Sequence, residues 1–260
     1  MNNARSASRG LAWGLGLMLL AASLTLHPVF ATGAGTSPPD PGRPMSADVT
    51  TEKRVLATRT SRADFKHEEA SPDARRIAAW IMDSGDNRGT PFAIVDKIAS
   101  KVFVFDARGR LRGASPALVG LASGDDSVPG IGQRKMSTIR PEERTTPAGR
   151  FVASLERSPH GEEILWVDYD AAVALHPVVV IPSERRLERL ASATPQDRRI
   201  TYGCINVPVK FFKEVVSPVF RGTSGIVYVL PETRSSSAEF EPHAVHQKQY
   251  PRAAGLIISP

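Results

Sequence analysis

The chain of 260 residues has a single cysteine, and this scarcity excludes two kinds of structure. One cysteine cannot form an internal disulfide framework, and the paired cysteines of common zinc sites are absent. No internal repeat of solenoid or propeller period is visible. Basic residues exceed acidic ones by 33 to 27. No basic–aromatic motif of a nucleic-acid-binding module accompanies them, so we expect no nucleic acid as partner.

Long apolar runs are also missing, apart from one near the start. Arg5 and Arg9 precede an uncharged apolar run, Leu11–Leu26, and Ala31 then offers a small residue at a cleavage junction. This order predicts a secretory signal peptide. An uncleaved membrane anchor is the alternative, because the run is slightly short of the ~20 residues of a spanning helix. Either way we expect an exported chain, in the periplasm or cell envelope, that meets a membrane only through this segment.

Composition divides the rest of the chain. Ser71, Pro72 and Asp73 form a helix start and Gly85 a stop, whereas Gly, Ser, Pro and Thr dominate the segment before them. The tail after Pro231 is polar and is expected to be disordered. The predicted divisions are a signal peptide at 1–31, a flexible linker at 32–66, an N-terminal helix within 67–89, the main domain at 90–233 and a disordered tail at 234–260.

Short strand-like runs dominate the main domain and predict a β-rich, mixed β fold with few helices. Two helices are expected, at Glu184–Leu190 and at Val209–Val216, the second ending before Pro218. The stretch from Gly120 to Thr146 has little periodicity, and a loop of this length is often a lid or a binding element. The predicted strands include Phe92–Val95, Lys101–Phe105, Ala117–Gly120, Ile164–Val167, Val178–Ile181 and Ile226–Leu230.

Cys204 follows Tyr202 and Gly203, at what we expect to be a strand end and a glycine turn just before a helix. Unpaired backbone N–H groups near a helix start can lower the pKa of a thiol and can bind an oxyanion. The alternative is a buried structural cysteine, which behaves as a small hydrophobic residue. A free thiol outside the cell is exposed to oxidation, which favours a functional cysteine.

A reactive cysteine needs a base, and two of the six histidines are candidates. His160 lies in a turn signature, Ser158–Gly161. His176 lies at the edge of an apolar strand, where a ring is either a buried core histidine or a positioned base. Spacing alone does not choose between these alternatives. The other four belong to the predicted signal peptide or to polar flanks: His27, His67, His243 and His246.

Three ordered motifs resemble those of the L,D-transpeptidase catalytic family (YkuD type). Thr201–Asn206 is similar to the family signature of Ser or Thr, usually His, then Gly-Cys, an apolar residue, and Asn or Arg. Thr146–Phe151 resembles the Thr-Pro-x-Gly-x-Phe element, and His176 falls where the family has its catalytic histidine. The resemblance covers roughly residues 90 to 231. It implies a β-sandwich or barrel-like domain with short peripheral helices.

Two features depart from the family pattern. Tyr202 stands where the family commonly has a histidine. The interval from His176 to Cys204 is longer than usual, and we place the insertion at Pro182–Arg198, where it could reshape the acceptor side. The longer interval also leaves His160 as the fallback for the base.

The resemblance implies a cysteine-dependent acyl transfer without cofactor or metal. Cys204 would be the nucleophile and His176 its base, with backbone N–H groups of Cys204 and of Gly203 or Tyr202 holding the oxyanion. Thr201 and Asn206 would contact the substrate. The implied donor is a tetrapeptide stem of peptidoglycan that loses D-Ala, and the acceptor is an amine on another stem or an envelope protein.

Three other functions remain open from the sequence. With water as acceptor the protein would be an L,D-carboxypeptidase. A domain impaired through Tyr202 would bind peptidoglycan without catalysis. A papain-like protease is disfavoured, because its cysteine precedes its histidine along the chain.

Overall fold

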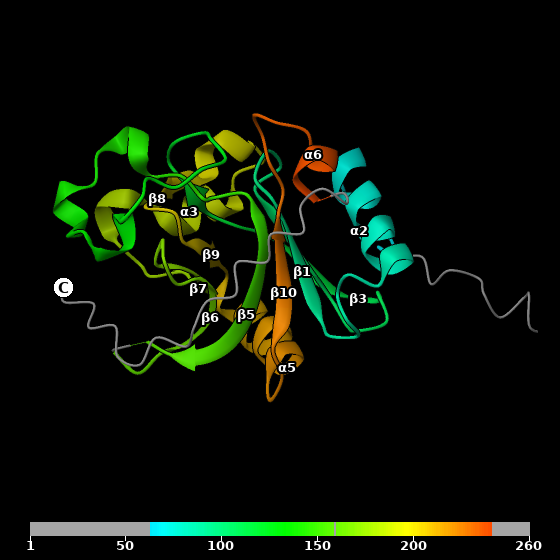
Figure 1. Cartoon of the computed structure of the whole chain (residues 1–260). Helices are drawn as coiled ribbons and strands as arrows, with labels where there is room; N and C mark the ends of the chain where they lie inside the picture. Colours follow the sequence, from blue (N-terminus) through cyan, green and yellow to red (C-terminus); the bar gives the residue numbers. More distant parts are fainter. Residues whose placement is uncertain (1–62, 159, 241–260) are drawn as a thin grey trace, which may run out of the picture. The chain divides into compact units, whose positions relative to one another are not determined.

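The computed structural model describes residues 63–158 and 160–240. The predicted signal peptide, most of the linker and the chain from 241 onward lie outside these residues. Within the described part, no helix combines the length and the apolar character needed to cross a membrane. The β-rich fold expected from the sequence is confirmed: one large sheet and one two-stranded sheet are accompanied by short helices (Figure 1).

The large sheet has eight strands in the order β3-β2-β1-β10-β5-β6-β7-β9. Two neighbouring pairs, β1–β10 and β7–β9, are parallel, and the remaining pairs are antiparallel. The strands are β1 Phe92–Asp96, β2 Lys101–Phe105, β3 Leu111–Pro116, β5 Gly149–Arg157, β6 Glu163–Asp168, β7 Val173–Pro177, β9 Ile205–Val207 and β10 Gly225–Val229.

The central strands are buried on both faces. In β1, Ala93 and Val95 belong to one apolar cluster, whereas Phe92 and Ile94 belong to another. This follows from the period-2 alternation of strand side chains. The first cluster also contains apolar residues from β2, β5, β6, β7, β9 and β10, together with Phe212, Val216 and Phe220. Strands covered on both sides read as continuous apolar runs, which is why the sequence revealed them.

The second cluster lies under helix α2, Pro72–Ser84, on the outer face of β1 and β10 (Figure 1). Ser71 caps this helix as expected, its hydroxyl accepting a hydrogen bond from the Ala74 N–H at 3.1 Å. Gly85 ends the helix with φ 67°. Ile77 and Ile81 lie one turn apart and are fully buried against the sheet.

The predicted disorder of residues 234–260 is wrong for the part that the structure describes. Ser236–Phe240 form helix α6, and Phe240 is buried in the second cluster beside Trp80 and Tyr228. Arg234 pairs with Asp126 and Glu239. The segment is mostly polar, and one aromatic residue, Phe240, provides the apolar surface that packs α6 against the second cluster. Phe65, in the predicted linker, is likewise buried there.

Two other predictions need correction. Val178–Ile181 is not a strand; β7 is Val173–Pro177, and Val179 and Val180 are mostly exposed. The helix from Val209 does not stop before Pro218. It continues as α4 (Val209–Phe211), a π-helical turn η6 (Phe212–Val216) and α5 (Ser217–Phe220). Pro218 lies at the start of α5, directly after the π-helical turn, and its ring nitrogen cannot donate a hydrogen bond to that preceding turn.

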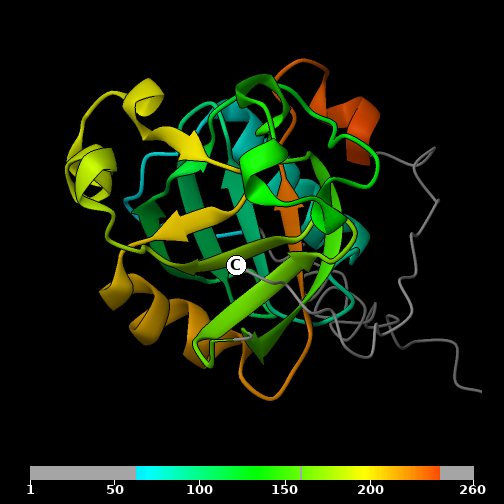
Figure 2. The same ribbon diagram turned by 90° about the vertical axis from the view of Figure 1, so that its left-hand side faces the viewer.

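The long loop between β4 (Val119–Gly120) and β5 contains three 3₁₀ turns, η1 Ile131–Gln133, η2 Met136–Thr138 and η3 Pro141–Glu143. β4 pairs in parallel with β8, Arg199–Thr201. The predicted insertion at Pro182–Arg198 forms a 3₁₀ turn η4 (Pro182–Glu184), helix α3 (Arg186–Ala191) and a 3₁₀ turn η5 (Pro195–Arg198). Figure 2 views the molecule from the side on which β7, β8, β9 and α3 lie.

Candidate active site

Cys204 lies in a tight turn between β8 and β9, where the sequence suggested the start of a helix. The next helix begins only at Val209, so no helix N-terminus acts on the thiol. Gly203 makes the turn possible. Its φ is 131°, and a Cβ there would come within 2.9 Å of the Thr145 carbonyl oxygen. Both the backbone conformation and the space therefore require glycine.

Hydroxyl groups hold this turn from both sides. The Thr201 hydroxyl donates to the Cys204 carbonyl at 2.7 Å and accepts from the Gly203 N–H at 3.2 Å. The Thr146 hydroxyl donates to the Gly203 carbonyl at 2.8 Å and accepts from the Gly120 N–H at 2.8 Å. Local hydrogen bonds thus satisfy the carbonyl groups of Gly203 and Cys204 and the N–H of Gly203.

His176 stands beside this turn because of strand pairing. β7 and β9 are parallel neighbours, and His176 is in register with Asn206, two residues after the cysteine. The Nδ1 of His176 lies 2.8 Å from the Pro177 carbonyl oxygen, and its Nε2 lies 2.9 Å from the Nδ2 of Asn206. Since a carbonyl can only accept, Nδ1 carries a proton.

Cys204 and His176 shift each other's pKa. Burial raises the pKa of the Cys204 thiol, but a hydrogen bond from His176 and its charge lower it by more, so the net direction is downward. Burial lowers the pKa of His176, and interaction with the Cys204 thiolate raises it by more. The Ala174 N–H also favours the thiolate. The pair can therefore exist as thiol and imidazole or as thiolate and imidazolium.

The floor of the site is the turn between β6 and β7. The Sγ of Cys204 lies 3.7 Å from the Ala172 carbonyl oxygen. The long loop packs on the same turn, because a Cβ on Gly132 would come within 2.4 Å of the Asp170 carbonyl oxygen. Both the middle and the end of the loop, at Gly132 and Thr146, thus approach the cysteine turn.

Tyr202 keeps the position before Gly203, and its ring faces the long loop. The guanidinium carbon of Arg144 lies 3.9 Å from the centroid of the Tyr202 ring, a cation–π contact. The side chain of Tyr202 is half-buried. In this chain it supports the end of the long loop.

The predicted substrate-contacting residues are buried. Thr201 is 2% exposed and Asn206 is 1% exposed, and their polar atoms are used within the site. These contacts suit positioning roles. The N–H of Gly203 is likewise engaged by Thr201, which leaves the N–H groups of Cys204 and Tyr202 as the candidates to bind an oxyanion.

Sequence reasoning missed Arg186. This residue begins α3 in the predicted insertion, and its Nη1 donates to the Oδ1 of Asn206 at 3.0 Å. Its side chain is only 10% exposed and pairs with Glu184. Charged residues in a short helix usually lie on a solvent-exposed face, so the composition gave no sign of this contact. It becomes visible only in the structure, where the insertion folds back toward β9.

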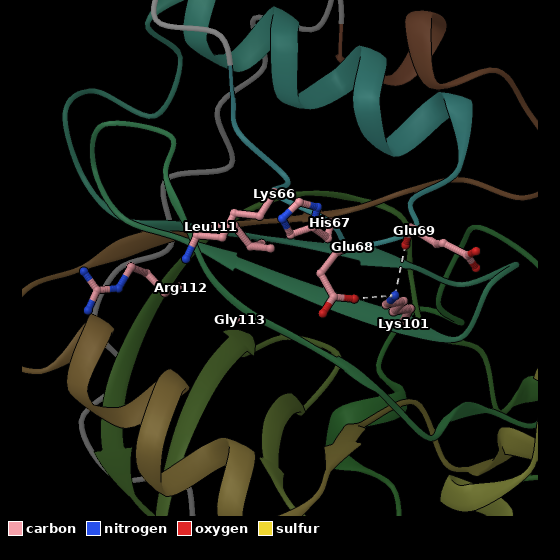
Figure 3. Close-up of a pocket in the computed structure, with 8 residues that line it drawn as sticks. All are labelled: Lys66, His67, Glu68, Glu69, Lys101, Leu111, Arg112 and Gly113. Carbon is pink, nitrogen blue, oxygen red and sulfur yellow. Dashed lines mark hydrogen bonds and ion pairs between the residues drawn. The ribbon is translucent and has the colours of Figure 1, made fainter.

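Other candidate features lie away from this cysteine. His160 is in the exposed turn between β5 and β6, and the histidine that lowers the pKa of the Cys204 thiol is His176. Among the described residues, no group of three or more His, Cys, Asp or Glu side chains is arranged to hold a metal. Figure 3 shows the residues that line a hollow around Glu68 and Lys101, which are ion-paired at 3.0 Å. The volume of this hollow is about 640 Å³. None of the residues that line it belongs to the cysteine turn.

Comparison with known proteins gives no match to a family model or to a curated protein. Solved structures align weakly. The helical cell shape determining protein Pgp2 from Campylobacter jejuni is 13% identical, with 56% of this chain and 49% of that chain covered and a TM-score of 0.36.

The catalytic domain of an L,D-transpeptidase from E. faecium is 17% identical, with 55% of this chain and 98% of that domain covered and a TM-score of 0.33. An L,D-transpeptidase from Xylanimonas cellulosilytica is 13% identical, with 65% and 76% covered and a TM-score of 0.35. The chain spans about half the length of the Pgp2 structures it matches.

Proposed function

We propose that this protein is a cysteine-dependent L,D-transpeptidase that acts on peptidoglycan peptide stems. The observation that carries the proposal is the coupling of Cys204 to His176, two residues that the family motifs single out and that strand pairing brings together. Because its pKa is lowered, more of the thiol is present as thiolate, which is the nucleophilic form. The proposed setting is the cell envelope, where such stems occur.

In the first half-reaction, the Cys204 sulfur attacks the carbonyl carbon of the amide before the terminal D-Ala. His176 holds the thiol proton on Nε2, and the N–H groups of Cys204 and Tyr202 bind the oxyanion. One such donor is worth about 3 kcal/mol. When the tetrahedral intermediate collapses, the C–N bond breaks and His176 protonates the departing amine. The products are D-Ala and a thioester on Cys204.

In the second half-reaction, an amine of another stem or of an envelope protein attacks the thioester. His176 takes the proton of the attacking amine, the C–S bond breaks and a new amide forms. The sulfur leaves as a thiolate and recovers its proton from His176, so the cycle consumes no cofactor. Water in place of the amine would give hydrolysis, the carboxypeptidase outcome.

The decisive experiment is intact-protein mass spectrometry after incubation with a disaccharide–tetrapeptide. We expect a mass increase that corresponds to the stem minus D-Ala, located on Cys204 by peptide mapping, together with free D-Ala. Cys204→Ala should give neither, and its circular dichroism spectrum should match that of the wild type.

Adding an amine acceptor then separates the two outcomes. A new cross-linked product supports transpeptidation, and a trimmed stem alone supports carboxypeptidase activity. Release of D-Ala by Cys204→Ala protein would contradict the proposal, because the reaction would then not need this thiol. An unmodified Cys204 in wild-type protein that still sediments with sacculi would contradict it too, and would favour a binding domain.

A further inference from the structure

A chain of three hydrogen bonds runs from Arg186 in the insertion, through Asn206 and His176, to the Pro177 carbonyl. Arg186 donates to the Oδ1 of Asn206 at 3.0 Å, and the Nδ2 of Asn206 lies 2.9 Å from the Nε2 of His176. The Nδ1 of His176 lies 2.8 Å from the Pro177 carbonyl oxygen. Asn206 is 1% exposed and the Arg186 side chain 10%, so water does not replace these partners.

The chemistry of the two ends fixes the direction of every bond. A guanidinium can only donate, so the amide oxygen of Asn206 must face Arg186 and its NH₂ group must face His176. A carbonyl can only accept, so Nδ1 of His176 is the protonated nitrogen. The Nε2 of the neutral ring is therefore an acceptor. The orientation of the Asn206 amide, which its own shape does not reveal, follows from its contact with Arg186.

Protonation at Nε2 breaks this pattern. The new N–H would point at the NH₂ group of Asn206, placing two donors face to face. Rotating the amide would offer its oxygen to the imidazolium, but its NH₂ group would then face the guanidinium of Arg186. The charge of Arg186 also disfavours a second cation nearby and lowers the pKa of His176.

We propose that Arg186 is a positioning residue that acts through Asn206 to keep the Nε2 of His176 an acceptor and to disfavour its imidazolium. During acylation the thiol proton moves from sulfur to Nε2, and Asn206 loses its acceptor. Transfer of that proton to the departing amine restores the bond. Arg186 thereby promotes delivery of the proton to the leaving group, a role that rests on the proposed function.

Four charged or titratable groups from different elements face or influence His176. Cys204 in the β8–β9 turn and Glu162 in the β5–β6 turn favour the imidazolium. Arg186 in α3 opposes it, and Glu184 in η4 pairs with Arg186 and partly offsets its charge. Removing Arg186 removes both the opposing charge and the restraint on the amide, and the two losses act in the same direction on His176.

The test is an NMR titration of His176 in protein with ¹⁵N-labelled histidine rings, with the signal assigned by a His176→Gln variant. We expect the wild-type ring to be protonated on Nδ1 when neutral. Arg186→Met should raise the pKa of His176 by about one pH unit, a tenfold change in protonation. Arg186→Lys, which keeps a charge and a donor, should restore most of the wild-type value.

Two further variants keep the proposal falsifiable. Arg185→Met removes the adjacent, exposed charge, whose partner is Glu188, and should leave the titration of His176 unchanged. Asn206→Asp offers an acceptor to Nε2 even with Arg186 in place and should raise the His176 pKa. An Arg186→Met titration that superimposes on wild type, a neutral ring protonated on Nε2, or equal shifts in Arg185→Met and Arg186→Met would overturn the proposal.

This titration needs no substrate. If the stem does not acylate Cys204 while the His176 shifts occur as expected, the proposed function fails and the hydrogen-bond chain stands. If acylation occurs and the titrations coincide, the function stands and the role of Arg186 fails.

Discussion

Two polar clusters of this protein, one largely buried and one half-buried, serve different purposes. The Asp125 cluster consists of Lys97, Asp125, Arg199 and Glu232; the Cys204 site consists of Cys204, His176, Asn206 and Arg186. In the first, Lys97 donates to Asp125 at 2.9 Å and to the Gly124 and Thr146 carbonyls at 2.5 and 3.0 Å. All three donors of its ammonium group are used.

Asp125 is equally well satisfied. It accepts from Lys97, from the hydroxyl of Thr233 and from the N–H groups of residues 232, 233 and 234. Burial raises its pKa, and these hydrogen bonds lower it by more, to well below the ordinary range. In the Cys204 site, by contrast, the Nε2 of His176 accepts from Asn206, and in the proposed reaction the same nitrogen also takes the proton of Cys204. Because every polar group of Lys97 and Asp125 has a hydrogen-bond partner, the Asp125 cluster stabilises one conformation. In the Cys204 site, two groups compete for one acceptor, and we expect the thiol proton to move more easily.

Thr146 joins the two clusters. Its carbonyl accepts from Lys97, and its hydroxyl donates to Gly203 in the cysteine turn. The comparison therefore predicts that damage to the Asp125 cluster lowers stability first, and that damage at Thr146 affects stability and chemistry together.

The largest expected effect on stability comes from Asp125→Ala, which leaves Lys97 as a buried cation without its main partner. The free energy of unfolding in urea should fall by about 3–5 kcal/mol. Asp126→Ala is the matched control, because the side chain of Asp126 is 81% exposed and pairs only at the surface with Arg234. It should cost less than about 1 kcal/mol. Equal losses of unfolding free energy in Asp125→Ala and Asp126→Ala would contradict a stabilising role of the Asp125 cluster.

Thr146→Val should have an intermediate effect, because it leaves the Gly203 carbonyl and the Gly120 N–H buried without this partner. We expect a loss of about 1–3 kcal/mol of unfolding free energy, with slower acylation of Cys204 because the turn loses a support. Thr145→Val, at the adjacent buried position, keeps both bonds and serves as control. Unchanged acylation in folded Thr146→Val would show that the two clusters are independent.

The smallest effect concerns the long loop. Hydrogen bonds from Arg134 and from Arg140 lower the pKa of Glu143 to about 2. A depressed folded pKa gives stability that is present above the ordinary pKa of about 4.3 and is lost as pH falls toward 2. Glu143→Gln should therefore lose less stability than wild type between pH 5 and pH 2, measured by urea unfolding at each pH. Parallel curves for the two proteins would contradict this.

The sequence revealed the parts of the fold whose cause is local. Phe92–Val95 and Ile226–Leu230 are continuous apolar runs because both faces are buried, and both are strands. β5 and β9 escaped notice because a partly exposed strand and a three-residue strand carry weak patterns. Val178–Ile181 misled because β-branched residues there are exposed beyond the end of β7.

The candidate site was predictable only in part. The motifs point to Cys204 and His176, but the parallel pairing of β7 with β9 that aligns them is a long-range contact. The hydrogen bond between Thr146 and Gly203 joins residues 57 positions apart in the sequence. The hydrogen bond between Arg186 and Asn206 depends on how the insertion folds back toward β9. No local pattern encodes such contacts, since each depends on the position of a whole element.

The central claim is that His176 ionises Cys204, and the pH dependence of Cys204 alkylation by iodoacetamide tests it most directly. A free thiol titrates near pH 8.5. The account predicts that the midpoint for wild-type protein lies below this value and that His176→Ala moves it upward, with alkylation at pH 7 slowed at least about tenfold. Superimposable profiles for the two proteins would contradict the claim.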